Sequence, residues 1–572
     1  MLKVNVKESA HLAVLSLLLL FSFLYLNDYH IFHELYFYSS DLARSASVAK
    51  NLYTFGEYST QTLPLLALDD YSNIPLSSSG YWLNSDRQPF SIFCISFLKT
   101  LFPDLSIVLI AQAYSLLTAV AVLLLVLYLA RVVFASNAIW AVAILAMFPN
   151  FLVQIISKGG EDVFFFLLQF SALLGIVKHQ NKTISLYLKV ALYFAVVGVL
   201  YSRFYLQVFF LLPWCYIYFK YPKVRSSLIY TAVLSGISFA PWLYFNHIRF
   251  GELLYSVNGA IQLWFDLPMS YFSNTWWLYK LSVSEAPVSE IMQKSFLFII
   301  NNIKFFIINW TTALAALLIC VRKWRYLTQL ECFILGTCAS SFVLSLVMLS
   351  PFAFSGAIID YFIFLVPLFA LLKIIIIRQW INGNLSLVEK CILLFTVLFY
   401  LVRKVYGLEG GALLFLFCCA IALCICFFRA KPFWAAVVCM LLFVREVPAW
   451  KGFASAFAIQ NMHHVAGLPE FKNADLIFSL NGFWGITLIT DAKVLPLPEK
   501  IEYIDEIASN LNVSKDKVVI VIGNPPKDVS QFKIPKSSQV YVNAYQDNLD
   551  LGSYSLTHTI ESVKLWQRAK AQ

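Results

Sequence analysis

The chain has 572 residues, of which 60% are hydrophobic and only 13% are charged. A soluble globular protein is about half apolar and about a quarter charged, so this composition excludes an ordinary soluble domain. The formal net charge of +10 would suggest nucleic-acid binding in a soluble protein, but basic loops between membrane spans account for it as well. Some of these cations are also available to a polyanionic substrate.

The apolar residues are gathered in continuous runs of about 17–25 residues, the length that a helix needs to cross a membrane. Because the runs do not alternate apolar and polar residues, they predict helices and not the strands of a barrel. We predict a polytopic α-helical membrane protein with about thirteen spans. The predicted spans lie near 10–26, 106–130, 137–156, 162–177, 185–201, 204–219, 226–245, 297–320, 330–349, 359–377, 385–402, 411–428 and 432–444.

Basic residues indicate the orientation of the spans. With Lys3 and Lys7 in the cytoplasm, every second short loop is basic, as the positive-inside rule requires. These loops contain Arg131, Lys178, Lys182, Lys220, Lys223, Arg225, Arg322, Lys323, Arg325, Arg378, Arg429 and Lys431. Two long loops, 27–105 and 246–296, then lie outside, where loops of such length are usually functional. Short loops without a retention signal favour the bacterial inner (plasma) membrane.

The composition changes after Trp450, where the apolar runs give way to alternating short segments. Strand-like runs and a helical stretch at 501–511 predict a small extracytoplasmic α/β domain over 451–572, after a transmembrane module over 1–450. The strand-like runs are Asp475–Leu480, Lys493–Leu497, Val518–Ile522 and Gln539–Ala544.

An acidic residue opens an alanine-rich segment shortly after the first span. Asp41 is followed by several alanines, and Gly56 stands where a helix would end. The pattern predicts a short helix that lies along the membrane surface, with Asp41 at its start.

Three further segments carry polar residues at the outer ends of spans. Asp86 and Arg87 come just before a proline that opens an amphipathic stretch. Glu161 and Asp162 follow a Gly-Gly pair in a later outside loop, and Tyr361 begins a Tyr-x(5)-Pro segment. The chain has no GxxxxGK[ST] or GxGxxG motif and no DxD pair, which argues against a nucleotide-linked substrate.

In this order the segments resemble the membrane glycosyltransferases of the GT-C type, nearest to the protein mannosyltransferase and aminoarabinose transferase branch. That pattern has an acid before an alanine-rich helix ending in Gly-x-Tyr, a basic-x-Pro step, a second-loop acid, and a late Tyr-x(5)-Pro. A small α/β domain often closes such chains. The resemblance covers nearly the whole sequence and implies a donor sugar carried on a polyprenyl phosphate.

The resemblance also implies roles for the acidic residues. Asp41 matches the general base that takes a proton from the acceptor hydroxyl, and Glu161 or Asp162 matches the second-loop acid. The acceptor is a lipid, a glycan or a protein. The resemblance fixes no cofactor and leaves a divalent metal ion open.

Four residues are candidates for binding the substrate. Arg87 matches the cation that holds the lipid phosphate, and Tyr361 matches a tyrosine near that phosphate. Asp86 is its neighbour in sequence, and Arg203, between two spans on the outside, is a candidate second phosphate contact. The family often has Lys-Pro-Pro where this chain has Arg-Gln-Pro, and a basic residue where this chain has Asp360, which leaves the exact donor open.

Each candidate also has a simpler interpretation. Asp41 can be a helix N-cap, and Glu161 and Asp162 can stabilise a helix start through the helix dipole. Arg87 can anchor to lipid headgroups, and Arg203 can extend to the interface.

Two other functional classes remain as alternatives. A transporter or flippase of lipid-linked glycans predicts charged residues buried mid-span, whereas Lys304, Lys373 and Glu389 lie near predicted span ends or can extend to the interface. A non-catalytic glycan-assembly subunit predicts that the loop acids are dispensable.

Overall fold

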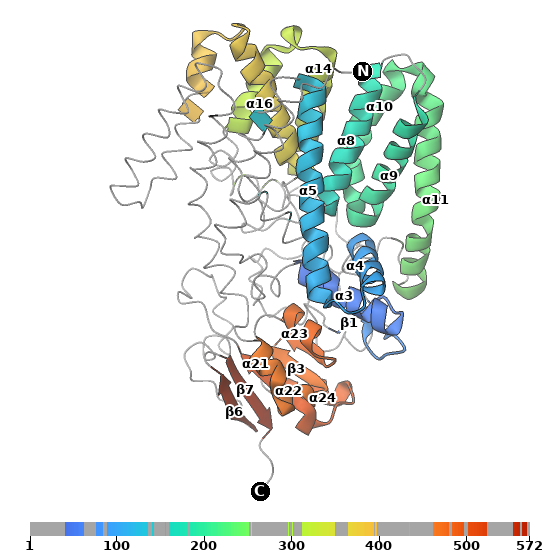
Figure 1. Cartoon of the computed structure of the whole chain (residues 1–572), viewed down its shortest axis with the longest axis vertical. Helices are drawn as coiled ribbons and strands as arrows, with labels where there is room; N and C mark the ends of the chain where they lie inside the picture. Colours follow the sequence, from blue (N-terminus) through green and yellow to red (C-terminus); the bar gives the residue numbers. More distant parts are fainter. Residues whose placement is uncertain are drawn as a thin grey trace, which may run out of the picture.

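Long helices fill one part of the molecule, and a mixed sheet with short helices lies at its opposite end (Figure 1). The computed structural model describes residues 41–61, 76–83, 89–134, 140–141, 151, 155, 159–179, 184–250, 253, 296, 300, 312–348, 364–393, 395–396, 434, 462–479, 483–496, 502–522, 553–560 and 563–568.

Five helices in the described part of the chain are long and apolar enough to cross a membrane. They cover Ile107–Phe134, Glu161–His179, Leu186–Arg203, Pro222–Arg249 and Gln329–Leu346. Each coincides with a predicted span, which confirms a helical membrane protein at this level. The predicted spans 10–26 and 411–428 lie outside the described residues, as do nearly all of 137–156 and 432–444.

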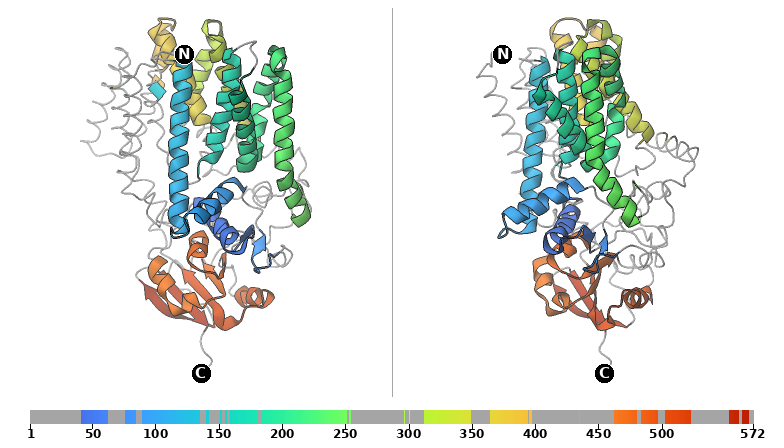
Figure 2. Two further views of the ribbon diagram at one scale, coloured as in Figure 1. Left: turned by 45° about the vertical axis from the view of Figure 1, so that its right-hand side comes forward. Right: turned by 90° about the vertical axis from the view of Figure 1, so that its right-hand side faces the viewer.

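The main helices of the bundle pack side by side (Figure 2). Their bounds are α5 Ile107–Phe134, α8 Glu161–His179, α9 Leu186–Arg203, α10 Leu211–Lys220, α11 Arg225–Phe250, α14 Gln329–Met348 and α16 Leu365–Ile381. Short 3₁₀ turns connect or extend them at η2 Phe204–Phe210, η3 Pro222–Val224 and η5 Trp324–Tyr326.

The segment η2 differs from the prediction, which had a single helical span over 204–219. A 3₁₀ run of seven residues is uncommonly long. Here the Gln207 side chain exchanges hydrogen bonds of 3.0 and 3.1 Å with Gln169 of α8 and also donates to the Val196 carbonyl. These partly buried amide contacts hold η2 against α8 and α9, a constraint that apolar periodicity does not reveal.

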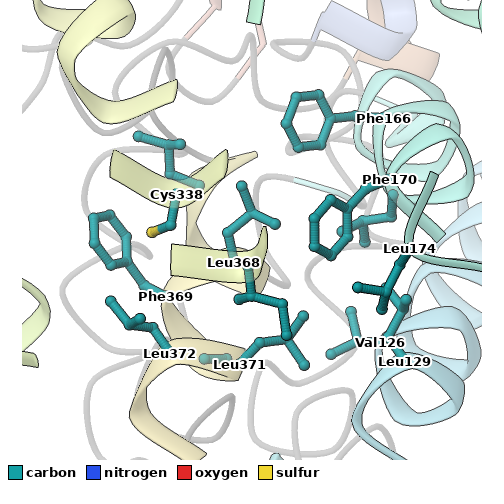
Figure 3. Packing of buried hydrophobic residues seen from close by; sticks show 14 of the residues in the cluster. Val126, Leu129, Phe166, Phe170, Leu174, Cys338, Leu368, Phe369, Leu371 and Leu372 are labelled. Atoms are coloured by element: carbon teal, nitrogen blue, oxygen red, sulfur yellow. The ribbon is translucent and has the colours of Figure 1, made fainter. Parts of the chain in front are cut away.

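The core between the helices is made of aliphatic and aromatic side chains. Figure 3 shows Leu368 and Leu371 of α16 lying toward Phe170 and Leu174 of α8. The helix α16 is buried almost all round, as expected for a helix whose residues from Leu365 to Leu372 are all apolar.

One end of the bundle carries ion pairs of lysine and arginine, and we call it the basic end. Lys178 of α8 donates to the Val132 carbonyl of α5, so these two helices end together. Arg378 of α16 lies 2.5 Å from the buried Glu331 of α14. A buried carboxylate needs such a partner, and this pairing ties the ends of the two helices together.

The opposite end, which we call the loop end, holds α3 (Asp41–Phe55), β1 (Ser59–Thr60), β2 (Trp82–Leu83) and α4 (Pro89–Leu101). The helix α3 confirms the short helix that was predicted to begin at Asp41 and to end at Gly56. Gly56 has φ +70° and donates its N–H to the Leu52 carbonyl at 3.0 Å, which is the left-handed cap that glycine favours.

A five-stranded sheet lies next to the loop end, in the order β4-β3-β5-β7-β6. The strand β3 is parallel to β4 and β5, whereas β7 is antiparallel to β5 and β6. We call residues 462–568 the C-terminal unit. Its elements are α21 Met462–Gly467, α22 Pro469–Lys472, β3 Leu476–Ser479, α23 Phe483–Ile489, β4 Lys493–Pro496, α24 Glu502–Asn510, η7 Lys515–Lys517, β5 Val518–Ile522, β6 Tyr554–Ile560 and β7 Val563–Arg568.

Three of the four predicted strands are present in this sheet, as β3, β4 and β5, and the predicted helix is α24. The fourth, 539–544, and the proposed boundary near Trp450 lie outside the described residues. The hairpin of β6 and β7 was not predicted.

Candidate functional site

Four of the predicted site residues belong to described elements, and all four stand at helix ends. Asp41 is the first residue of α3, Glu161 and Asp162 begin α8, and Arg203 ends α9. The structure describes Asp41 only as part of its helix. The other three candidates, which are Asp86, Arg87 and Tyr361, lie outside the described residues.

Two glycines shape the turn that precedes Glu161. Gly159 has φ +99° and Gly160 has φ +66°, backbone conformations that side chains with a Cβ rarely adopt. A Cβ on Gly159 would stand 2.5 Å from Oε2 of Glu161. The Gly-Gly pair therefore allows the chain to turn sharply into α8 while the Glu161 carboxylate folds back over the turn.

The Glu161 carboxylate is enclosed where α4, α5 and α8 meet. Its Oε2 atom is buried, and the Tyr114 ring of α5 lies beside the same turn. Ser91 and Cys94 of α4 also lie close to Glu161. Ser91 in turn donates to the hydroxyl of Ser45 on α3 at 3.4 Å, so the surroundings of Glu161 extend to α3.

Asp162 and Arg203 form an ion pair that joins the start of α8 to the end of α9. Arg203 Nε lies 2.8 Å from Asp162 Oδ2, and the two side chains are 21% and 12% exposed. Asp162 Oδ1 also accepts the backbone N–H of Val163 at 2.8 Å, so the helix-start interpretation of this acid has direct geometric support. An acid at a helix start and a cation at a helix end both match the helix dipoles.

The sequence interpretation did not single out Arg44, Ser91 or Tyr114. Arg44 lies one turn after Asp41 on α3 and is almost fully buried, at 7% exposed, so a buried cation stands on the helix that Asp41 begins. Arg44 could have been selected from its spacing to Asp41 alone. Tyr114 is one aromatic residue within a long apolar run, and no local pattern distinguishes it.

The described residues contain no group of three or more His, Cys, Asp or Glu side chains that could hold a metal ion. Within this part of the chain, the start of α8 brings together two adjacent carboxylates, the Arg203 cation that pairs with Asp162, and the hydroxyl groups of Ser91 and Tyr114. Such a set can bind an anionic or hydroxylated ligand without a metal ion.

No protein-family model and no curated protein matches the sequence. Solved structures do match. The crystal structure of ArnT from Cupriavidus metallidurans bound to undecaprenyl phosphate aligns with a TM-score of 0.53 at 12% sequence identity, over 98% of each chain. The chain has the ArnT fold. The apo state of the same protein aligns with a TM-score of 0.50 at 12% identity, over 92% of each chain.

This match confirms the resemblance to the aminoarabinose transferase branch of the GT-C type at the level of the fold. It extends over nearly the whole chain, so the agreement is not limited to the helical bundle. At 12% identity the match bears on the fold alone.

Proposed function

We propose that this protein is a membrane glycosyltransferase that moves a sugar from a polyprenyl-phosphate donor to an acceptor on the non-cytoplasmic face. The observation that carries the proposal is the meeting of helix ends at the loop end. There the Asp162–Arg203 pair and Glu161 lie around α4, which packs on the helix that Asp41 begins. The ArnT fold, seen in a crystal structure with undecaprenyl phosphate bound, supports the choice of donor.

The proposed reaction is a single displacement. The acceptor oxygen forms a bond to the anomeric carbon while the bond from that carbon to the phosphate oxygen breaks. The polyprenyl phosphate leaves with the electron pair, and the hydroxyl proton passes to the carboxylate of Asp41. A fixed cation next to the leaving phosphate lowers the barrier because it meets charge that grows in the transition state.

We assign Arg203 and Arg87 to the phosphate, since the guanidinium fork can bind two phosphate oxygens. Asp162 then orients Arg203 through their 2.8 Å contact. Glu161 is assigned to the sugar or acceptor hydroxyls next to Tyr114, and Tyr361 and Asp86 complete the proposed binding residues. A divalent metal ion stays open as a cofactor.

The proposed architecture follows the ArnT fold. Residues 1–450 form the transmembrane catalytic module with about thirteen spans in the inner membrane, and residues 451–572 form an α/β domain outside the cytoplasm. The acceptor is a lipid, a glycan or a protein.

The described ion pairs do not favour a transporter. The buried carboxylates Glu331 and Glu389 lie at the basic end, where Arg378 and Lys323 pair with them. Charges that are paired at a helix end serve packing better than they serve a path through the membrane.

The test is sugar transfer by the purified protein from a panel of synthetic polyprenyl-phosphate sugars. We expect Asp41→Asn to lower transfer by about a hundredfold or more, in line with the loss of a general base. Asp104→Asn is the matched control, because Asp104 is an exposed residue of the turn between α4 and α5. If no donor is used, or if Asp41→Asn transfers sugar as well as the control does, the proposal is wrong.

A further inference from the structure

The C-terminal unit and the loop end share one hydrophobic core. A single cluster of buried side chains joins Val48 of α3 and Ile95 of α4 to Ile477, Ile486 and other residues of the unit. Figure 2 shows α23 of this unit directly against α3. The unit is therefore packed into the loop end and is not a separate body on a linker.

Lys50 of α3 is bound from the side of the C-terminal unit by three oxygen atoms. Its ammonium group donates to the carbonyls of Thr487 and Thr490, at 3.2 and 2.9 Å, and to Asp491 Oδ1 at 2.9 Å. Thr487 lies in the last turn of α23 and Thr490 directly follows its last residue, a place where backbone acceptors have no partner within the helix and where a cation is favoured. A lysine has three donors, so this contact uses all of them.

Two further residues of the first outside loop bind the same stretch, residues 487–494, which we call the docking segment. Gln61 donates to the Thr490 carbonyl at 3.1 Å and accepts the Val494 N–H on its own carbonyl at 2.9 Å. The Tyr81 hydroxyl donates to the Asp491 carbonyl at 2.6 Å. Most of these bonds use backbone groups of the docking segment, so they fix its path and not only its side chains.

The docking segment contacts α3 on the side of the helix that lies opposite Asp41. At about 100° per residue, position 50 of an ideal helix lies about half a turn away from position 41. The face with Lys50 and Ser47 meets α23, where the Ser47 and Thr487 hydroxyls lie 2.7 Å apart. Ser45, whose position is only about 40° from that of Asp41 on the helix, meets Ser91 of α4 instead.

We propose that the docking segment positions α3, so that the C-terminal unit is a working part of the transferase site. The inference rests on the proposed function and adds to it a role for Lys50, Gln61 and Tyr81 as positioning residues. A 15-residue helix is marginal by itself, so its placement depends on what packs against it. A displacement of about 1 Å at a reacting group can cost about a hundredfold in rate, so a small release of α3 would be measurable.

The first experiment uses the full-length protein and compares Lys50→Met with wild type. We expect kcat to fall about tenfold or more, with the donor KM changed less than about twofold, because the helix and not the donor contact is disturbed. Lys50→Arg, which keeps donors at this point, should recover most of the rate. The matched control is Lys517→Met, because Lys517 pairs with Asp475 at 2.9 Å on the exposed surface of the C-terminal unit, where both side chains are about half exposed.

A covalent link then separates positioning from folding. The Ser47 and Thr487 hydroxyls are close enough for a disulfide after substitution of both residues by cysteine. We expect oxidation to restore kcat in the Lys50→Met protein carrying Ser47→Cys and Thr487→Cys, and reduction to remove the gain again. Lys50→Met alone, treated with the same oxidant, should not change.

A readout independent of activity distinguishes the failure of this inference from the failure of the proposed function. Amide hydrogen exchange in Asp41–Phe55 should increase in Lys50→Met and return to the wild-type level in the oxidised double-cysteine protein. If wild type transfers no sugar but amide exchange changes as expected, the proposed transferase function is wrong, whereas the contact of Lys50 with the docking segment is supported. If Asp41→Asn abolishes transfer while Lys50→Met keeps kcat within twofold of Lys517→Met, the proposed transferase function stands and the positioning role of Lys50 is wrong.

Discussion

The turn before α8 requires glycine at both position 159 and position 160. Gly159 has a positive φ, and any Cβ there would press on the Glu161 carboxylate. Gly236 of α11 offers the opposite case, because a Cβ there meets nothing within 4 Å. Gly159 and Gly236 therefore make a matched pair of positions, which tests whether sugar transfer depends on the placement of the Glu161 carboxylate.

We predict that Gly159→Ala lowers sugar transfer about tenfold or more, since both backbone strain and the displaced carboxylate act on the same site. Gly236→Ala should keep full activity and should not destabilise the protein, because alanine is the better helix former. The measurement is transfer per folded protein, with thermal unfolding followed in parallel. Equal activity in the two variants would show that the placement of Glu161 is not needed.

Glu57 makes the loop that follows α3 sensitive to acid. Its carboxylate accepts hydrogen bonds from the Ser78 hydroxyl and from the N–H and hydroxyl of Ser79, which lower its pKa from 4.5 to about 2. A pKa that is lower in the folded state stabilises the fold above the unfolded pKa, and this stabilisation is lost as the pH falls through the folded pKa.

We therefore predict that the acid loss of stability between about pH 4.5 and pH 2 is smaller in Glu57→Gln than in wild type. Ser79→Ala removes a donor from the same carboxylate, so it should reduce the acid sensitivity in the same way. Melting temperatures recorded from pH 6 to pH 2.5 measure the effect. Parallel curves for wild type and Glu57→Gln would rule out this role for Glu57.

At the residue scale, the sequence predicts only those site residues that a local sequence pattern distinguishes. Asp41 was predicted at the start of an alanine-rich helix and does begin α3, and the simpler interpretation of Glu161 and Asp162 as a helix start agrees with the start of α8. Ser91 and Tyr114 could not be selected, because they join Glu161 only through the packing of three helices. Serines and tyrosines within apolar stretches have the same local pattern whether or not they face a site.

At the element scale, the pattern of apolar residues predicts the long helices well, but it predicts the 3₁₀ segment η2 and the hairpin of β6 and β7 poorly. Runs of apolar residues located α5, α8, α9, α11 and α14, since length and composition alone decide whether a helix can span a membrane. The 3₁₀ segment η2 depends on the amides of Gln169 and Gln207 meeting across 38 residues, which no window of sequence contains. The hairpin of β6 and β7 carries Thr, His and Lys among its apolar residues, so its alternation is weak.

The contact of α8 with α9 gives a prediction at this scale. Gly198 of α9 lies directly against the Phe165 ring, which itself packs edge-on against Phe90 at 4.7 Å. A methyl group at Gly198 would have to displace this buried ring. Overpacking of this kind costs about 1–3 kcal/mol, more than the roughly 1 kcal/mol that alanine gains in helix propensity.

We expect Gly198→Ala to lower the melting temperature clearly, and Gly336→Ala not to lower it, because a Cβ at Gly336 of α14 meets nothing within 4 Å. Thermal unfolding of both variants in the same detergent is the measurement. A Gly198→Ala protein as stable as Gly336→Ala would mean that α8 and α9 can separate at little cost.

At the scale of the whole molecule, the charge pattern predicted which helix ends lie together. Basic residues from distant loops, among them Lys178, Arg378 and Lys323, do gather at one end of the bundle. The junction between α3 and the C-terminal unit was beyond prediction, because Lys50 and Asp491 are 441 residues apart and each looks like an ordinary surface charge. Only the folded chain brings them together.

The arrangement of the two ends leads to a prediction about topology. The C-terminal unit packs on the loop end, whereas α8 ends at His179 at the basic end, beside the end of α5. Since basic loops stay in the cytoplasm, the C-terminus should lie outside. Alkaline phosphatase needs disulfides and is active only in an oxidising compartment, so its activity reports the side of the membrane. We expect activity when it is fused after Gln572 and none when it is fused after Lys182. Activity at Lys182 with none at the C-terminus would mean that the orientation of the protein is the reverse of the predicted one. The proposed site would then lie in the cytoplasm, and the donor assignment would be wrong as well.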